Sequence, residues 1–274
     1  MNNEFNLHDQ TILVTGANGL IGKEACDAFA SQGANLVITD IGPPSALKSF
    51  ANSINEKYGV QTLAVAADLT LEEPTTQLVT EAITRFGKVD TLLNLAAIDA
   101  KLDADKAGNL NPSRFENFPL DLWEKSLAIN ATGLIRITQE VVRHMLQRSS
   151  GNIINVASTY SLVSPNQTLY KYDDSNKQIY KPIDYVGSKS MVPNFTRYLA
   201  TLYAKEGIRA NYLVPHAIEN KQPEEFKQNF QKLSPIGRMC DVGELRGPLV
   251  FLASNASSYM TGASLVIDGG WTAW

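Results

Sequence analysis

Cysteine and histidine are scarce in this chain, which has two cysteines and three histidines among 274 residues. Cys26 and Cys240 lie far apart, so their spacing indicates neither a disulfide framework nor a metal site. Positive charge is also limited: 24 Lys and Arg face 28 Asp and Glu, and no basic run of five residues occurs. The net charge of −4 argues against a broad nucleic-acid or lipid surface and favours a small-molecule partner.

Long apolar runs are absent as well. No stretch reaches the roughly 20 apolar residues of a transmembrane helix, and residues 1–6 lack the features of a secretory signal. We therefore expect a cytoplasmic protein. A length of 274 residues with 44% hydrophobic residues suits one α/β domain, residues 1–274, better than two.

Strand and helix patterns alternate along the chain. Short, apolar, β-branched runs predict strands at 11–15, 35–39, 62–66, 91–95, 152–157, 209–214 and 264–267. Helices are expected at 20–32, 45–57, 72–86, 120–148, 185–206, 223–232 and 242–253. This alternation predicts an α/β fold with a doubly wound parallel sheet, covered on both faces and binding ligands at the carboxyl ends of its strands.

The first predicted strand runs into a glycine-rich turn from Gly16 to Gly22 and then into a helix. Such glycines let the main chain approach a pyrophosphate at the positive end of the helix. Asp40 ends the next strand, where a carboxylate can bind ribose hydroxyls and repel a 2′-phosphate. With Asn18 in the turn and no arginine after Asp40, the pattern predicts NAD rather than NADP. Each feature alone also occurs in ordinary loops.

Tyr185 and Lys189 stand four residues apart at the start of a predicted helix, so their side chains share one face. We expect the ammonium to lower the pKa of Tyr185 from ~10 towards neutrality, as a general acid/base requires. None of the other nine tyrosines has a lysine at this offset. An isolated pair of this kind also occurs on solvated helix faces.

Other polar residues fall near predicted strand ends or on apolar stripes. Ser158 follows the fifth strand and could donate to a substrate oxygen, with Thr159 and Ser161 as rivals. Asn130 lies beside an apolar helical stripe, where an amide needs partners and is more often structural than catalytic. His216 has no carboxylate at readable spacing, so we expect it in a loop that touches solvent or substrate.

Residues 159–184 are rich in hydroxyls, amides and aromatic rings. This composition suits a hydroxylated substrate rather than a fatty chain, although a solvated surface loop has the same polarity. Residues 215–235 include a charged helical stretch that is expected to form a mobile cover.

Taken together, these motifs resemble the classical short-chain dehydrogenases/reductases over essentially the whole chain. The resemblance is carried by the glycine turn from Thr15 to Gly22, Asp40, Asp68, Asn130, Ser158, Tyr185-x-x-x-Lys189, Pro215 and the ending from Thr261 to Gly270. It implies a Rossmann-type sheet of seven strands, an NAD(P)-dependent oxidoreductase and a homotetramer or other homo-oligomer.

The resemblance also implies a catalytic tetrad. Tyr185 would transfer the proton, Lys189 would lower its pKa and hold the nicotinamide ribose, Ser158 would orient the substrate oxygen, and Asn130 would position a water. The cofactor contacts that it implies are Gly16, Asn18, Leu20, Ile21, Gly22, Asp40, Asp68, Leu69, Asn94, Ala96, Tyr185, Lys189, Pro215 and Ile218.

Three features depart from the family pattern. Asn94-Leu95-Ala96-Ala97 replaces the usual Asn-Asn-Ala-Gly, His216 replaces a glycine, and the long separation between Ser158 and Tyr185 indicates an insertion in the substrate pocket. That polar insertion and the stretch 222–226 resemble members linked to bacterial surface-sugar and flagellin-modification pathways.

We therefore expect an NAD-dependent enzyme that moves a hydride between nicotinamide and a secondary alcohol or ketone of a sugar or sugar derivative. One alternative is a 3-oxoacyl-(acyl carrier protein) reductase, which would normally use NADPH and a basic docking patch. A non-catalytic binding or scaffold protein on the same fold is another.

Overall fold

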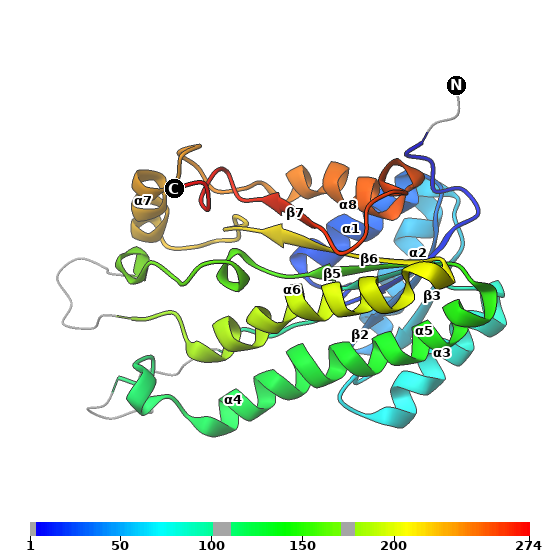
Figure 1. Ribbon diagram of the computed structural model, residues 1–274, viewed down its shortest axis with the longest axis horizontal. Coiled ribbons are helices and arrows are strands. Elements are labelled where there is room, and N and C mark those ends of the chain that lie inside the picture. Colours follow the sequence, from blue (N-terminus) through cyan, green and yellow to red (C-terminus); the bar gives the residue numbers. More distant parts are fainter. Residues whose placement is uncertain (1–3, 101–110, 171–178) are drawn as a thin grey trace.

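Seven parallel strands form one sheet in the order β3-β2-β1-β4-β5-β6-β7 (Figure 1). The computed structural model describes residues 4–100, 111–170 and 179–274. The strands are β1 Thr11–Thr15, β2 Asn35–Asp40, β3 Thr62–Ala66, β4 Thr91–Asn94, β5 Gly151–Val156, β6 Ile208–Pro215 and β7 Ser264–Ile267. The predicted doubly wound, seven-stranded sheet is thus confirmed. Its order reverses between β1 and β4, the place where such sheets bind ligands.

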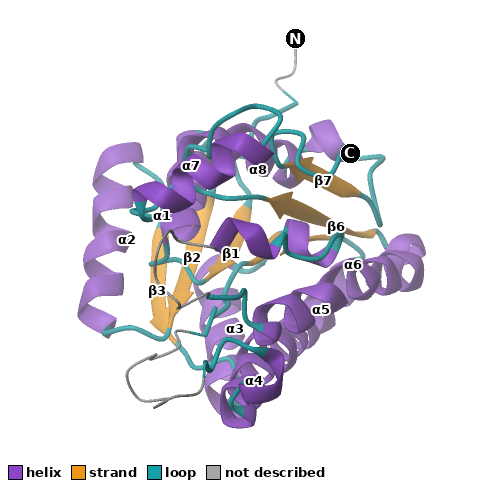
Figure 2. Ribbon diagram, turned by 90° about the vertical axis from the view of Figure 1, so that its left-hand side faces the viewer, coloured by secondary structure: helices purple, strands orange, loops and turns teal. Residues whose placement is uncertain are grey.

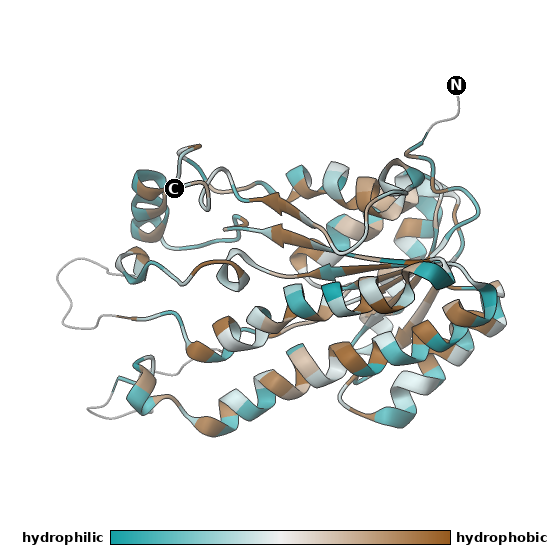
Figure 3. Cartoon of the chain, viewed as in Figure 1, coloured by the Kyte–Doolittle hydropathy of each residue, from teal (hydrophilic) through white to brown (hydrophobic). Residues whose placement is uncertain are grey.

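Helices cover both faces of this sheet (Figure 2). The longer helices are α1 Leu20–Ser31, α2 Pro44–Tyr58, α3 Glu72–Phe86, α4 Leu120–Leu127, α5 Leu134–Arg148, α6 Ile183–Tyr203, α7 Glu224–Leu233 and α8 Arg246–Ala253. Successive strand residues supply opposite faces: Ile12 and Val14 pack with α1, α2 and α8, whereas Leu13 packs with α3, α5 and α6. Figure 3 shows the strands as mainly hydrophobic, while the helices carry both hydrophobic and hydrophilic residues.

The helix predicted over 120–148 is interrupted. A π-helical segment, Ala128–Gly133, separates α4 from α5 and contains Asn130. Such widened turns occur often at functional sites, and hydrophobic periodicity did not reveal this one. The helix predicted from residue 185 begins earlier, at Ile183, directly after Pro182.

The insertion and the expected cover meet at an aromatic and aliphatic cluster. Within 159–184 the structure has short helical turns at Thr159–Ser161 and Gln167–Tyr170, and residues 171–178 lie outside the described part. Leu169 from the second turn packs with Phe230 of α7 and with Trp271. The mobility of the cover stays a prediction. In the described residues, no helix is both long and apolar enough to cross a bilayer.

Candidate active site

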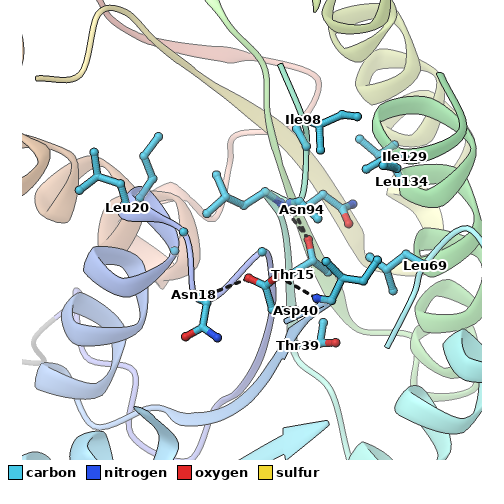
Figure 4. Close-up of a pocket in the computed structure, with 18 of the residues that line it drawn as sticks. Thr15, Asn18, Leu20, Thr39, Asp40, Leu69, Asn94, Ile98, Ile129 and Leu134 are labelled. Carbon is cyan, nitrogen blue, oxygen red and sulfur yellow. Dashed lines mark hydrogen bonds between the residues drawn. The ribbon is translucent and has the colours of Figure 1, made fainter. Parts of the chain in front are cut away.

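A cavity of about 730 Å³ opens at the carboxyl ends of the central strands (Figure 4). Its lining includes these predicted cofactor contacts: Gly16, Asn18, Leu20, Ile21, Gly22, Asp40, Asp68, Leu69, Asn94, Ala96 and Ile218. Pro215, Tyr185 and Lys189 were also predicted to bind the cofactor but are not part of that lining. The structure therefore gathers most of the predicted contacts around one crevice.

The turn after β1 leaves no room for larger side chains. Gly16 has a φ of +67°, and a Cβ there would lie 2.9 Å from Ala96 Cα. A Cβ at Gly22 would lie 2.2 Å from the carbonyl oxygen of Gly16. The Thr15 hydroxyl accepts hydrogen bonds from the backbone N–H groups of Leu95 (3.0 Å) and Ala96 (3.1 Å). Thr15 thus fixes the segment where this chain departs from the family pattern.

Asp40 faces the turn from the end of β2. One carboxylate oxygen accepts the Asn18 N–H at 2.9 Å, and the other accepts the Ile41 N–H at 2.8 Å (Figure 4). Among the described residues that line the cavity there is no lysine or arginine, whereas Asp40, Asp68 and Asp99 all belong to the lining. The glycine cradle and the aspartate at the end of β2 fit a dinucleotide.

The Asn94 side chain is turned into the protein. Its amide N–H group donates to Thr138 Oγ1 at 2.9 Å and to Asn155 Oδ1 at 2.8 Å. The Asn155 amide in turn donates to Thr196 at 2.9 Å. Asn94 is therefore a brace between β4, α5 and β5 as well as part of the cavity wall.

The end of β5 and the start of α6 bring Ser158, Tyr185 and Lys189 together. The Ser158 side chain lies close enough to Tyr185 to favour its phenolate, and it accepts the Tyr160 N–H at 3.2 Å. The buried Lys189 ammonium lies 5.9 Å from the centre of the Tyr185 ring and donates to the Val156 carbonyl at 2.7 Å. Tyr185 and Lys189 thus lie on one face of α6, as predicted.

The expected lowering of the Tyr185 pKa is wrong for this structure. Burial raises the pKa of Tyr185 to about 12, the Asp99 charge adds to this rise, and the Ser158 side chain opposes it. Burial also lowers the pKa of Lys189 to about 8. The ammonium is directed at the Val156 carbonyl, and burial is the largest cause of both shifts.

Asn130 finds the partners that a buried amide requires. Its side chain accepts the Ile98 N–H at 2.8 Å and donates to the Ile98 carbonyl at 2.8 Å and to Ser188 Oγ at 3.0 Å. The π-helical segment thereby fixes both the chain after β4 and the first turns of α6. This is a structural role, and the predicted water-positioning role stays a prediction.

Sequence reasoning did not single out two charged residues close to Tyr185. The Lys181 ammonium lies 4.4 Å from the centre of the Tyr185 ring and pairs with the Asp99 carboxylate. Lys181 was one polar residue among many in the insertion, and no short spacing links residues 99 and 181. Only their approach in the fold identifies them.

His216 lies in the loop after β6, as expected, but it is buried, so the expected contact with solvent is wrong and a contact with substrate stays a prediction. It is 7% exposed, with its ring centre 4.4 Å from that of Trp271 and 5.4 Å from that of Phe230. Nδ1 shares a hydrogen bond of 2.5 Å with Thr159 Oγ1. Burial lowers the pKa of His216 to about 4, so the ring is neutral near pH 7. Trp271 and Phe230 come from distant parts of the chain, which is why spacing gave no signal.

Comparison with known proteins agrees with this geometry. Residues 16–272 match the profile of a family described as "Enoyl-(Acyl carrier protein) reductase". The chain belongs to the short-chain dehydrogenase/reductase family. As a member of this family it is an oxidoreductase with a nicotinamide cofactor of the NAD(P) type.

Similar proteins of this family act on polyols and sugar derivatives. An NAD-dependent glycerol dehydrogenase of Listeria innocua is 30% identical, over 98% of this chain and 96% of the relative. A galactitol 2-dehydrogenase (L-tagatose-forming) of Cereibacter sphaeroides is 30% identical, over 98% of each chain. The crystal structure of a gluconate 5-dehydrogenase from Burkholderia cenocepacia, in complex with NADP and tartrate, matches with a TM-score of 0.84 and 28% identity, over 99% of this chain and 98% of that one.

Proposed function

We propose that this short-chain dehydrogenase/reductase interconverts a secondary alcohol and a ketone on a sugar or polyol, with NAD as its cofactor. The observation that carries the proposal is that Ser158, Tyr185 and the buried Lys189 lie near one another at the end of β5 and the start of α6, on a fold whose cavity fits a dinucleotide. The cofactor accepts or supplies the hydride. The names of the relatives and the polar insertion support the substrate class.

In this proposal the chain's own residues move one proton and hold one oxygen. Ser158 donates to the substrate oxygen, and Tyr185 gives a proton to it during reduction or takes one during oxidation. With a pKa of about 12 the phenol is protonated near neutrality, so the site is ready to donate to a ketone. Oxidation of an alcohol needs the phenolate, and its rate is therefore expected to rise with pH.

The preference for NAD rests on charge. Asp40 lies where an adenosine ribose is expected, and the described lining of the cavity has no cation for a 2′-phosphate. The relatives reported above include an NAD-dependent enzyme and one crystallised with NADP, so the preference belongs to the proposal.

Two alternative functions are distinguished from this proposal by experiment. The matching family profile has an acyl carrier protein in its description, which keeps reduction of a 3-oxoacyl thioester open. The net charge of −4 and Asp40 disfavour it. A non-catalytic scaffold would have no use for Ser158, Tyr185 and Lys189 at one end of the sheet. A homotetramer or dimer, a cytoplasmic location and a surface-sugar or flagellin-modification pathway also stay predictions.

The test is a screen for NADH formation from NAD with glycerol, galactitol, L-rhamnose, sugar phosphates and nucleotide sugars, beside NADPH consumption with acyl thioesters. We expect turnover of a sugar or polyol with NAD. Tyr185→Phe should abolish this turnover and leave the Kd for NADH within about threefold, because the phenol supplies the proton. Tyr259→Phe, at a fully exposed tyrosine, is the matched control. Turnover retained by Tyr185→Phe, or turnover of acyl thioesters alone, would contradict the proposal.

A further inference from the structure

An ion pair lies against the tyrosine that moves the proton. Lys181 pairs with Asp99, and its ammonium is 4.4 Å from the Tyr185 ring centre and 6.0 Å from the Tyr160 ring centre. The Lys181 side chain is 11% exposed, whereas Asp99 is 47% exposed. The pair therefore has a largely buried lysine and a solvent-accessible aspartate next to Tyr185.

Both members stand on firmly held backbone. On the Asp99 side, Asn130 binds both backbone groups of Ile98 at 2.8 Å, and the carboxylate of Asp184 accepts the Ala100 N–H at 3.2 Å. Asp184 is fully buried and also accepts the Ser126 hydroxyl at 2.6 Å. The three residues that end in Ala100 are thus clamped at both ends, with Asp99 between the clamps.

Lys181 is held from the other side of the site. Its backbone N–H donates to the Gln167 side chain at 2.9 Å, and the N–H of Tyr180 donates to Ser113 Oγ at 3.0 Å. Two residues later α6 begins, and its first turn carries Tyr185. The backbone on both sides of Lys181 is therefore fixed, and this holds its side chain over the Tyr185 ring.

The pair lies between two hollows. Asp99 lines the cavity of about 730 Å³ that fits the dinucleotide. Lys181 lines a second hollow of about 390 Å³, together with Ser113, Tyr180 and Val186. Each hollow thus has one member of the pair in its wall, and the lysine of the pair lies beside the Tyr185 ring.

We propose that Asp99 and Lys181 together recognise a hydroxyl on the carbon next to the reacting carbon, and that the substrate is a neutral vicinal diol. The inference rests on the proposed function and narrows it to uncharged polyols and sugars. A hydroxyl can donate to a carboxylate and accept from an ammonium at the same time, which matches what the pair offers. A substrate carboxylate or phosphate would meet the Asp99 charge and would have to displace Asp99 from Lys181.

Three alcohols of the form CH3-CHOH-X test the inference: 1,2-propanediol, 2-propanol and lactate. They present a hydroxymethyl, a methyl or a carboxylate beside the same secondary carbon. A hydrogen bond to a charged group contributes roughly 10- to 100-fold. We expect kcat/KM for the diol to exceed that for 2-propanol and for lactate by at least about tenfold with NAD.

The variants separate recognition from support of the fold. Lys181→Met should reduce kcat/KM for 1,2-propanediol about tenfold or more. The kcat/KM for 2-propanol and the Kd for NADH should stay within about threefold of wild type. Asp99→Asn should raise the ratio of lactate to diol turnover by about tenfold, because Lys181 is then free to bind a carboxylate. Lys181→Arg keeps the charge and should restore most of the diol preference. Lys205→Met, at an exposed lysine after α6, is the control.

The outcomes distinguish this inference from the proposed function. An enzyme that oxidises sugars or polyols of the screen but 1,2-propanediol no better than 2-propanol overturns the inference alone. Equal losses for the diol and 2-propanol in Lys181→Met also overturn it, because they would show that the ammonium only supports Tyr185. No turnover of any sugar or polyol overturns the proposed function itself.

Discussion

Replacing Asp40 by Asn tests how the cavity selects its cofactor. The Asp40 carboxylate accepts the Asn18 N–H at 2.9 Å, and an amide oxygen in the same place can still accept it. Asp40→Asn therefore removes the negative charge and keeps the bond from Asn18, while the bond from the Ile41 N–H is lost because that N–H then faces the amide NH2 group. Asp121→Asn, at an exposed carboxylate of α4, is a matched control for charge alone.

The size of the effect follows from two contributions. A ribose hydroxyl that donates to a carboxylate gains about 1 kcal/mol more than one that donates to a neutral oxygen, so NADH binding should weaken about fivefold. A 2′-phosphate about 4 Å from the partly exposed carboxylate is repelled by about 2 kcal/mol in water-like surroundings, which Asp40→Asn relieves. The ratio of the NADH and NADPH dissociation constants should therefore shift by about 3 kcal/mol, or roughly 100-fold, towards NADPH.

The assay is fluorescence titration of both reduced cofactors at low ionic strength and at about 0.15 M, where the Debye length is about 8 Å. The phosphate contribution should shrink with salt, and the ribose contribution should not. A shift below threefold in Asp40→Asn, or an equal shift in Asp121→Asn, would refute the reasoning and place cofactor selection elsewhere.

Three further variants test packing and titration. Gly22→Ala should weaken NADH binding at least about tenfold and lower the Tm, because its Cβ would lie 2.2 Å from a backbone oxygen, whereas Gly247→Ala, with nothing within 4 Å, should be neutral or stabilising. Lys189→Met should abolish turnover, yet it should raise the free energy of unfolding at pH 7 by about 1 to 2 kcal/mol. Burying the ammonium costs about 3 kcal/mol, and the hydrogen bond to Val156 offsets only part of that cost. The pKa of Lys189 is lower in the folded than in the unfolded state, so wild type should gain stability as the pH rises from about 8 to 10.5. Denaturant titrations should show the difference in unfolding free energy between wild type and Lys189→Met becoming smaller over this range. His216 also has a depressed pKa, so wild type should lose about 3 kcal/mol more than His216→Gln as the pH falls from about 6.5 to 4.

Each of these has a contrary outcome. Equal NADH affinity in the two glycine variants would mean that the turn adapts to the added methyl. A Lys189→Met protein less stable than wild type at pH 7 would show that the lysine packs more favourably than its burial indicates. Parallel acid unfolding of wild type and His216→Gln would mean that the ring can be protonated in the folded state.

Local patterns were enough to predict the sheet and to gather residues around one crevice. Strands such as β1 are short apolar runs, so their burial can be predicted without knowing which segments pack against them. Gly16, Gly22 and Asp40 follow strand ends at readable spacings, and parallel strands bring their carboxyl ends to one edge. These residues line the same cavity because the fold class alone places them there.

The tertiary structure decided what depends on approach between distant segments. The π-helical turn at Asn130, the burial of His216 against Trp271, and the pairing of Lys181 with Asp99 have no periodicity or short spacing in the sequence. The same holds for the pKa of Tyr185. The sequence showed a lysine four residues away, but the direction of the shift depends on how much water the folded chain removes from both groups and on which oxygen the ammonium faces.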